Sequence, residues 1–162
     1  GGQGFGLDIA KRFLDSGAKV IIWDIDEKLL KSAVDEVNNS NLSYNVIDVS
    51  NYSQIEKTVS EITSKNKIDI LINNAGITGP TAPLWEYDVE MWNKIVQINL
   101  VGTFNCCRAI VPSMIKNNTL EYPENKIALF TEFHNTLYKQ YSESLSGATH
   151  ILLKMYHLWR ST

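Results

Sequence analysis

The sequence predicts an α/β fold in which a doubly wound parallel sheet is covered by helices on both faces. Two observations predict it: segments with helical and with strand character alternate from residue 4 to residue 76, and the strand candidates are continuous apolar runs. Continuous apolar runs suit strands that are covered on both faces. Helical connections between such strands require right-handed crossovers, which make the sheet parallel.

The first elements along the chain are a helix, a strand and a second helix. Apolar residues recur at helical spacing from Ile9 to Leu14, and Gly17 follows, where a helix C-terminus prefers glycine. Residues 19–24, KVIIWD, are rich in β-branched side chains and are expected to form a strand. Residues 27–37, EKLLKSAVDEV, place their apolar side chains on one stripe of a helix.

The next elements repeat this alternation. We expect a strand at residues 42–49, a helix at 52–62, and a third apolar strand at 68–76 that ends in the polar turn NNAG. A loop rich in Pro and Gly then leads to a long helix from about Val89 to Lys116, in which Pro112 is a candidate kink. Weaker patterns predict a fourth strand at 126–130 and a last helix at 147–159.

Composition excludes several classes of partner. The chain has 162 residues, 44% of them apolar, which is the size and composition of one soluble domain. A net charge of -3 provides no basic field for nucleic acid. We see no apolar run of about twenty residues and no signal-peptide pattern, so we expect a cytoplasmic protein without a membrane partner. Cys106 and Cys107 are adjacent and no zinc-ligand spacing is present, so we expect no metal.

Ligands of such folds bind beyond the carboxyl ends of the strands. The opening stretch GGQGFG runs directly into a helix, and Gly4 and Gly6 would let backbone N–H groups approach a pyrophosphate. The strict G-x-G-x-x-G spacing is absent. A tight turn without a ligand is therefore the alternative interpretation.

Asp24 ends the first predicted strand, eighteen residues after Gly6. A carboxylate about twenty residues past such a loop can accept both ribose hydroxyls of adenosine and would repel a 2′-phosphate, which favours NAD over NADP. The alternative is that Asp24 caps the next helix, a role that Asp26 could fill instead.

Two further polar stretches follow predicted strands. The Asp48 carboxylate and the Val49 amide could hold the exocyclic amine and a ring nitrogen of adenine, although Asp48 is also a candidate cap for the next helix, beside Ser50 and Asn51. The stretch NNAG, residues 73–76, follows a fully apolar strand. A turn would explain its residue types, but not its position near the other features.

GGQGFG, Asp24, IDVS, INNAG and INLVG at these spacings resemble the short-chain dehydrogenase/reductase family, in its classical type, which includes 3-oxoacyl-carrier-protein reductases. The resemblance extends from Gly1 to about Asn118 and implies a Rossmann-like fold. The residues that it assigns to NAD binding are Gln3, Gly4, Phe5, Gly6, Asp24, Asp48, Val49, Asn74, Ala75 and Gly76.

The same resemblance implies that the chain is truncated at both ends. In the family a central first strand precedes the glycine loop, and further strands follow the last helix seen here. We therefore expect a single, incomplete dinucleotide-binding domain over residues 1–162 with a divergent tail at 119–162. The missing first strand would leave a gap between the strand ending at Asp24 and the strand ending at Asn73, so we expect lower stability than in a complete member.

The family's catalytic residues are Asn, Ser, Tyr and Lys. The resemblance implies that Asn99 in INLVG interrupts a helix and holds a water in a proton relay; the alternative is a polar residue at a kink. Tyr141 lies at about the right distance to be the proton-transferring Tyr, but Leu145 stands where the family has Lys. The stretch YPENK, from Tyr122 to Lys126, has the right letters but comes too early and contains a proline.

The resemblance implies an NAD-dependent oxidoreductase that interconverts a secondary alcohol and a ketone on a small molecule, and a homo-oligomer for the intact family member. The alternative is a degenerate, non-catalytic dinucleotide-binding domain or an inert fragment, which Leu145 favours because a phenol without a nearby cation is rarely ionised at neutral pH. An out-of-frame tail after Asn118 would also explain Leu145. An unrelated flavodoxin-like module would not need Asp48 and NNAG.

Overall fold

A computed structural model of the chain describes residues 1–117. Residues 1–79 and those from Asp88 onward belong to one compact unit, and residues 80–87 belong to another. The elements are α1 (Gly4–Asp15), β1 (Val20–Asp24), α2 (Glu27–Val37), β2 (Leu42–Val46), α3 (Tyr52–Thr63), the 3-10 turn η1 (Leu84–Glu86), α4 (Val89–Val96), the π-turn η2 (Gln97–Val101) and α5 (Gly102–Lys116). The short turn η1 lies in the second unit.

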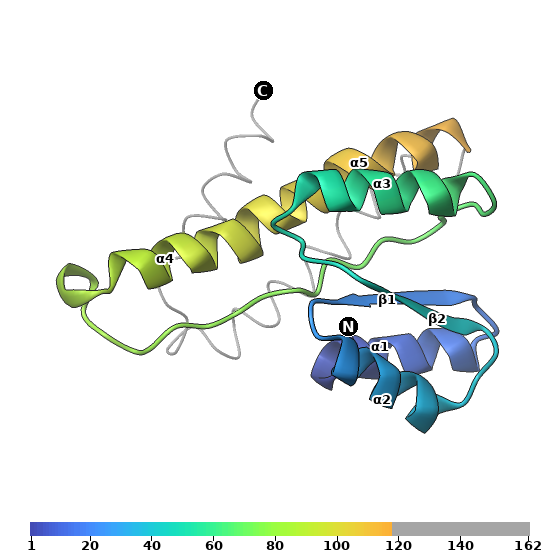
Figure 1. The fold of residues 1–162 in the computed structure, drawn as a ribbon, viewed down its shortest axis with the longest axis horizontal. Helices are drawn as coiled ribbons and strands as arrows, with labels where there is room; N and C mark the ends of the chain where they lie inside the picture. Colours follow the sequence, from blue (N-terminus) through green and yellow to red (C-terminus); the bar gives the residue numbers. More distant parts are fainter. Residues whose placement is uncertain (118–162) are drawn as a thin grey trace. The chain divides into compact units, whose positions relative to one another are not determined.

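The strands β1 and β2 are parallel and hydrogen-bonded in a register that pairs Val20 with Leu42 and Asp24 with Val46. The connecting helix α2 makes the predicted crossover. Helices α1 and α2 cover one face of this sheet, and α3 and α5 lie on the other side (Figure 1). The register places the carboxyl ends of both strands side by side, and the Ile47 amide donates to the Asp24 carbonyl at 2.8 Å.

A continuous apolar core forms between the sheet and the first two helices because each helix carries one apolar stripe. Leu30 of α2 is fully buried. Burying a leucine side chain contributes about 1.5–3 kcal/mol. The buried members of this core are Leu7, Ala10, Leu14, Ile22, Leu30, Ala33 and Leu42.

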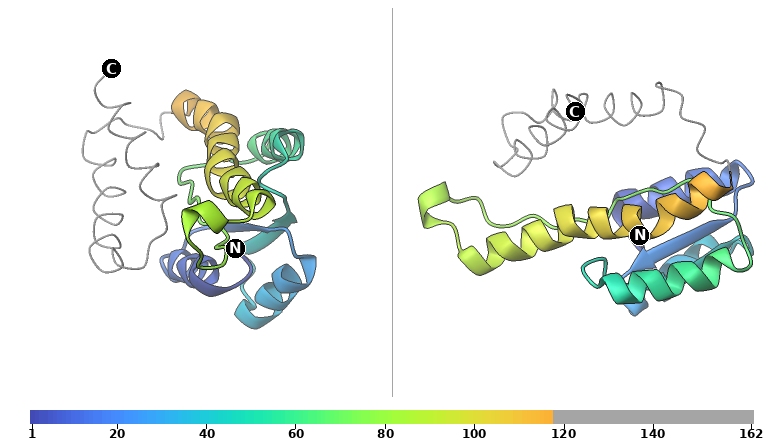
Figure 2. Two further views of the ribbon diagram at one scale, coloured as in Figure 1. Left: turned by 90° about the vertical axis from the view of Figure 1, so that its left-hand side faces the viewer. Right: turned by 90° about the horizontal axis from the view of Figure 1, so that it is seen from above.

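Helices α3 and α5 lie side by side (Figure 2). The buried side chains of the two helices are Ile55, Val59, Cys106, Ile110 and Met114, together with Gly102 and Asn105. The Arg108 guanidinium lies over the Tyr52 ring, 5.6 Å from its centroid. Helix α5 continues through Pro112 to Lys116, so this proline does not end it.

The third predicted strand is not observed, since residues 67–83 form neither helix nor strand. The prediction of a strand at 68–76 is therefore wrong for this structure. A strand exists only where a neighbouring backbone supplies hydrogen bonds, and among residues 1–117 the sheet has two strands, which pair with one another. Ile70 and Ile72, expected to be covered, are 58% and 47% exposed.

The second strand is also shorter than predicted. It ends at Val46 rather than Val49 because β1, its partner strand, ends at Asp24, the residue that pairs with Val46. Beyond this point the Gln54 side chain binds the backbone of Val46 and Asp48. Its Nε2 donates to the Val46 carbonyl at 2.9 Å, and its Oε1 accepts from the Asp48 amide at 3.0 Å. The chain therefore leaves the sheet in a turn at residues 48–50.

One helical stretch within the described residues, Val89–Lys116, is long and apolar enough to cross a membrane by length and composition, with a mean hydropathy of 1.2 over its most apolar window. This stretch departs from the expectation that no apolar run approaches the length of a membrane span. The core helix of a folded α/β protein passes the same test, and here α5 packs against α3.

Candidate functional site

The glycine-rich loop enters α1 with an open N-terminus. Gln3 is the N-cap in extended conformation, and its side chain makes no capping hydrogen bond. Gly4 has φ of +54°, and a Cβ added there would meet open space. Within residues 1–117 the amides of Phe5 and Gly6 donate no hydrogen bond, so the helix presents unpaired N–H groups and the positive end of its dipole.

Asp24, at the carboxyl end of β1, is bound to this loop. Its Oδ2 accepts from the Gly1 ammonium at 2.9 Å and from the Gly2 amide at 3.0 Å, and its Oδ1 accepts from the Asp26 amide at 3.2 Å. Partial burial opposes ionisation of the carboxylate, but these hydrogen bonds and the ammonium charge outweigh it, so the pKa of Asp24 lies below its ordinary value.

Asp26, not Asp24, caps the following helix. The Asp26 Oδ1 accepts from the amides of Lys28 and Leu29 at 2.8 and 3.3 Å, which is the N-cap geometry. The alternative reading of Asp24 as the cap of α2 is therefore wrong.

Asp48 lies just beyond β2 and organises a turn. Its Oδ1 accepts from the Ser50 amide at 2.9 Å and from the Ser50 hydroxyl at 2.7 Å. Asn51 caps α3 by accepting from the Gln54 amide at 3.1 Å, so Asp48 does not cap this helix either. Within residues 1–117, Asp48 Oδ2 accepts no hydrogen bond and the Val49 amide donates none.

The NNAG stretch lies against the glycine loop at one end. A Cβ added to Gly6 would lie 2.7 Å from Asn74 Nδ2 and 3.1 Å from the Cα of Gly1. Only a residue without a side chain fits at position 6 unless its neighbours shift. Asn73 points its Nδ2 at the Cys107 Sγ, 3.4 Å away, which ties the stretch to α5.

The other end of NNAG lies against Asn99. A Cβ added to Gly76 would lie 3.4 Å from Asn99 Oδ1. The Asn99 side chain makes two hydrogen bonds with the backbone of the next residue, Ile77. The Ile77 amide donates to Asn99 Oδ1 at 2.9 Å, and Asn99 Nδ2 donates to the Ile77 carbonyl at 3.0 Å. Asn99 lies in the π-turn η2, so the expected interruption of the long helix is present at this residue.

The structure thus joins most of the expected site residues through contacts. Asp24 binds the glycine loop, the glycine loop lies against Asn74, and Gly76 lies against Asn99. Asp48 and Val49 follow the neighbouring strand end. Tyr141, Leu145 and the YPENK stretch lie outside the described residues.

Sequence reasoning missed Gln54 and Asn105. Both hold the backbone of the turn at residues 48–50, and Asn105 Nδ2 donates to the Val49 carbonyl at 3.0 Å. For Asn105 the sequence does hold a signal: a polar amide stands on the face of α5 that is otherwise buried with Cys106 and Ile110.

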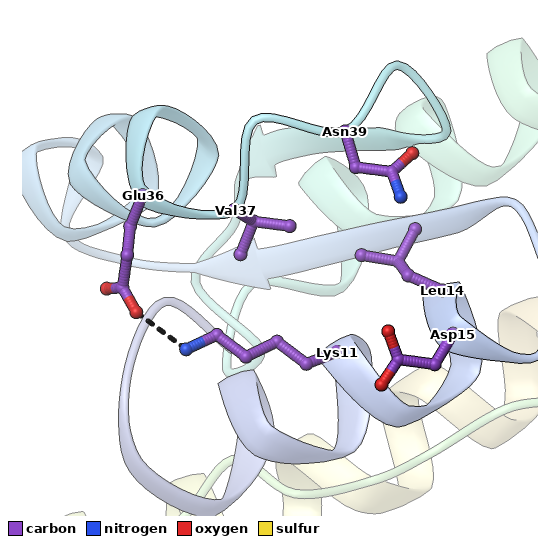
Figure 3. A pocket seen from close by; sticks show the side chains of 6 residues that line it. All are labelled: Lys11, Leu14, Asp15, Glu36, Val37 and Asn39. Atoms are coloured by element: carbon purple, nitrogen blue, oxygen red, sulfur yellow. Dashed lines mark hydrogen bonds and ion pairs between the residues drawn. The ribbon is translucent and has the colours of Figure 1, made fainter.

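A cavity of about 310 Å³ lies at the opposite end of the first two helices from the glycine loop (Figure 3). Lys11 and Glu36 form an ion pair of 2.6 Å across it. Its lining residues are Lys11, Leu14, Asp15, Glu36, Val37 and Asn39, which come from the second half of α1, the end of α2 and the loop that follows. The cavity is therefore separate from the residues described above.

A parallel α/β unit with a glycine loop at a helix N-terminus and a carboxylate at the adjoining strand end defines a Rossmann-type nucleotide-binding fold. Residues 1–119 match the short chain dehydrogenase family, and the chain belongs to this family. Its members are oxidoreductases that bind a nicotinamide dinucleotide.

Over 118 residues the chain is 34% identical to 2-dehydro-3-deoxy-L-rhamnonate dehydrogenase (NAD(+)) of Sphingomonas sp. (strain SKA58), covering 72% of this chain and 47% of that protein. Two solved structures are similar. One is the 3-ketoacyl-(acyl-carrier-protein) reductase of Brucella melitensis complexed with NADH, with TM-score 0.67, 32% identity, and coverage of 72% of this chain and 48% of that one. The other is the closed form of serine dehydrogenase complexed with NADP+, with TM-score 0.69 and 27% identity. The match covers 86% of this chain and 63% of that one.

The chain spans about half the length of the curated relative. These similarities support the 3-oxoacyl-reductase-like type expected from the motifs.

Proposed function

We propose that the chain binds NAD and belongs to an oxidoreductase that interconverts a secondary alcohol and a ketone on a small molecule. The observation that carries the choice of NAD is Asp24. Like any aspartate that is not deeply buried, it is ionised at neutral pH, and it lies at the end of β1 against the glycine loop. An ionised carboxylate has about four acceptor positions, of which three are used here, so it can still accept a ribose hydroxyl.

The same carboxylate disfavours NADP, because a 2′-phosphate would be brought next to a negative charge. The similar proteins include an NAD(+)-named enzyme, a complex with NADH and a complex with NADP+. The family alone therefore leaves both dinucleotides open, and the proposal rests on this residue.

The chemistry of the donor set fits a dinucleotide. The unpaired amides of Phe5 and Gly6 suit the pyrophosphate, with Gln3 and Gly4 forming the turn before them. The unpaired Val49 amide and the Asp48 Oδ2 are one donor and one acceptor, which is what adenine's ring nitrogen and exocyclic amine require. Asn74, Ala75 and Gly76 would contact the part of the cofactor nearer the substrate.

The nicotinamide supplies or accepts the hydride when the dinucleotide is bound. In this proposal Asn99 fixes the loop at Ile77 and holds a water of the proton relay, and Tyr141 transfers the proton to or from the substrate oxygen. We also propose a cytoplasmic location and a homo-oligomeric assembly.

A second function has one specific observation in its favour. Leu145 stands four residues after Tyr141 in the sequence, where the resemblance expects a lysine. A phenol without a neighbouring cation is rarely ionised at neutral pH, so proton transfer would be slow. The chain would then bind the dinucleotide without turning over substrate.

Titration with NADH and NADPH separates these proposals, with energy transfer from the four tryptophans as the signal. We expect NADH to bind about tenfold more tightly than NADPH, or better. We expect Asp24→Ala to lower the affinity for NADH. Unchanged NADH affinity in Asp24→Ala would refute the cofactor assignment. A spectrophotometric assay on alcohols and ketones runs alongside, and binding without turnover supports the non-catalytic alternative.

A further inference from the structure

Among the described residues, Asn105 is the buried polar side chain of the molecule, with 6% of its surface exposed. It lies on α5, on the same buried face as Cys106 and Ile110. Burying an amide without hydrogen bonds is unfavourable, and an apolar residue would fill this position without that cost. The carboxamide must therefore be accounted for by what it binds.

Asn105 binds the backbone of the turn after β2. Its Nδ2 donates to the Val49 carbonyl at 3.0 Å and approaches the Ser50 carbonyl at 3.5 Å. One turn earlier on the same helix is Gly102, where an added Cβ would lie 2.7 Å from Val49 Cγ2. Helix α5 thus combines a gap for the Val49 side chain with a donor for the Val49 carbonyl.

Gln54 holds the same turn from the α3 side. Its Oε1 accepts from the Asp48 amide, and its Nε2 donates to the Val46 carbonyl. The Asp48 Oδ1 in turn accepts from Ser50. With these groups used, the turn retains one unpaired donor and one unpaired acceptor within residues 1–117, the Val49 amide and the Asp48 Oδ2.

We propose that Asn105 is a positioning residue for adenine recognition, and that it acts through the turn at residues 48–50. Asn105 holds the Val49–Ser50 peptide plane through the Val49 carbonyl, and Gln54 holds the Ile47–Asp48 plane through the Asp48 amide. The plane between them, which carries the Val49 donor, is therefore held from both sides, beside the Asp48 acceptor. Gln54 is its counterpart on α3. The inference rests on the proposed function, since it assigns adenine to this turn.

Helix α5, which carries Asn105, follows directly on the π-turn η2, which carries Asn99. Asn99 holds the Ile77 backbone. One continuous helical stretch therefore holds the adenine-side turn by one asparagine and the loop after NNAG by another, six residues earlier. This arrangement sets the spacing between the two ends of the proposed dinucleotide site.

The test measures the affinity of the full 162-residue chain for AMP, for reduced nicotinamide mononucleotide and for NADH by calorimetry. In Asn105→Leu, which has a similar volume and no donor, we expect about tenfold weaker binding of AMP and NADH and unchanged binding of the mononucleotide. Ile110→Val is the matched control, because it loosens the same helix face without touching the turn. It should leave the affinity for AMP unchanged.

A double-mutant cycle shows whether Asn105 acts through Asp48. In an Asp48→Ala background the effect of Asn105→Leu on AMP should nearly vanish. If Asn105→Leu unfolds the chain, Gln54→Leu removes the clamp from the partly exposed α3 side and should give the same AMP-selective loss.

Equal losses for AMP and the mononucleotide, or AMP affinity equal to that of the unsubstituted chain, would overturn the inference while leaving the proposed function standing. An unsubstituted chain that binds the mononucleotide but not AMP would overturn both, because the adenine assignment itself would be wrong.

Discussion

Asn99 and Ile77 exchange two hydrogen bonds: the Ile77 amide donates to Asn99 Oδ1 at 2.9 Å, and Asn99 Nδ2 donates to the Ile77 carbonyl at 3.0 Å. Ile77 belongs to a segment without regular structure, and the Asn99 carboxamide supplies the two backbone hydrogen bonds that a neighbouring strand would otherwise supply to it. The π-turn brings Asn99 to this position without ending the helix. The contact therefore determines where the segment after NNAG lies.

Replacing Asn99 should release this segment. Asn99→Leu leaves both Ile77 groups without their partner, and we expect a loss of about 1–3 kcal/mol in the free energy of unfolding. Urea denaturation followed by tryptophan fluorescence measures it. Asn93→Leu, at an exposed position of α4, is the matched control and should change stability little. Equal stability of the two variants would show that the Ile77 contact contributes nothing.

A side chain at position 6 should weaken dinucleotide binding more than it weakens the fold. The added Cβ of Gly6→Ala collides with the end of the Asn74 side chain, which can rotate, and approaches the Gly1 backbone, which has less freedom. We expect NADH affinity to fall about tenfold or more because both loops must separate.

Ser16→Ala, at the exposed end of the same helix, is the control for Gly6→Ala and should bind as the unsubstituted chain does. Tryptophan-to-NADH energy transfer measures both affinities. Normal NADH affinity in Gly6→Ala would mean that the cofactor does not lie at this junction.

Features that depend on neighbouring residues were predictable, and features that depend on distant backbone were not. Helix α2 begins and ends at the predicted residues, Glu27 and Val37, because its apolar stripe and its Asp26 cap are local. Residues 68–76 carry a strand-like apolar run, but a strand requires a paired neighbour. Asn105 was missed because its partner, Val49, is 56 residues away in sequence.

The stability that Asp24 contributes should depend on pH in one direction. Its folded-state pKa is lower than that of an unfolded chain, about 3.9, so its hydrogen bonds stabilise the fold fully above that pH and are lost as the pH falls through the folded-state value. We expect the difference in unfolding free energy between the unsubstituted chain and Asp24→Asn to be constant from about pH 7 to 5 and to shrink below about pH 4.

Urea denaturation of both proteins at each pH gives this difference. The contributions of the carboxylates that both proteins share cancel in it. A difference that grows as the pH is lowered would contradict the assignment of a lowered pKa to Asp24.

The stability of the core between the sheet and helices α1 and α2 should depend on Leu30, a fully buried residue of α2. Leu30→Ala removes its contacts and leaves a cavity, and we expect a loss of about 2–5 kcal/mol in unfolding free energy. Lys31→Ala is the neighbouring control, since its ion pair with Glu27 is exposed and should matter little. If the two variants unfolded at the same urea concentration, the core described here would not be the one that holds α2.

The two adjacent cysteines should differ in reactivity. Cys106 is buried, and this burial, together with the neighbouring Cys107, raises the pKa of its thiol to about 11. At pH 8 only about one thousandth of it would be thiolate, the form that reacts. Cys107 is partly exposed and lies next to Asn73.

Labelling with a thiol reagent at about pH 8 tests this difference in single-cysteine variants. In the folded state Cys107→Ala, which retains Cys106, should react about tenfold more slowly than Cys106→Ala, or slower still. Both burial and protonation protect the Cys106 sulfur. In urea the two rates should converge. Fast labelling of Cys106 in the folded chain would mean that this thiol is not buried as described.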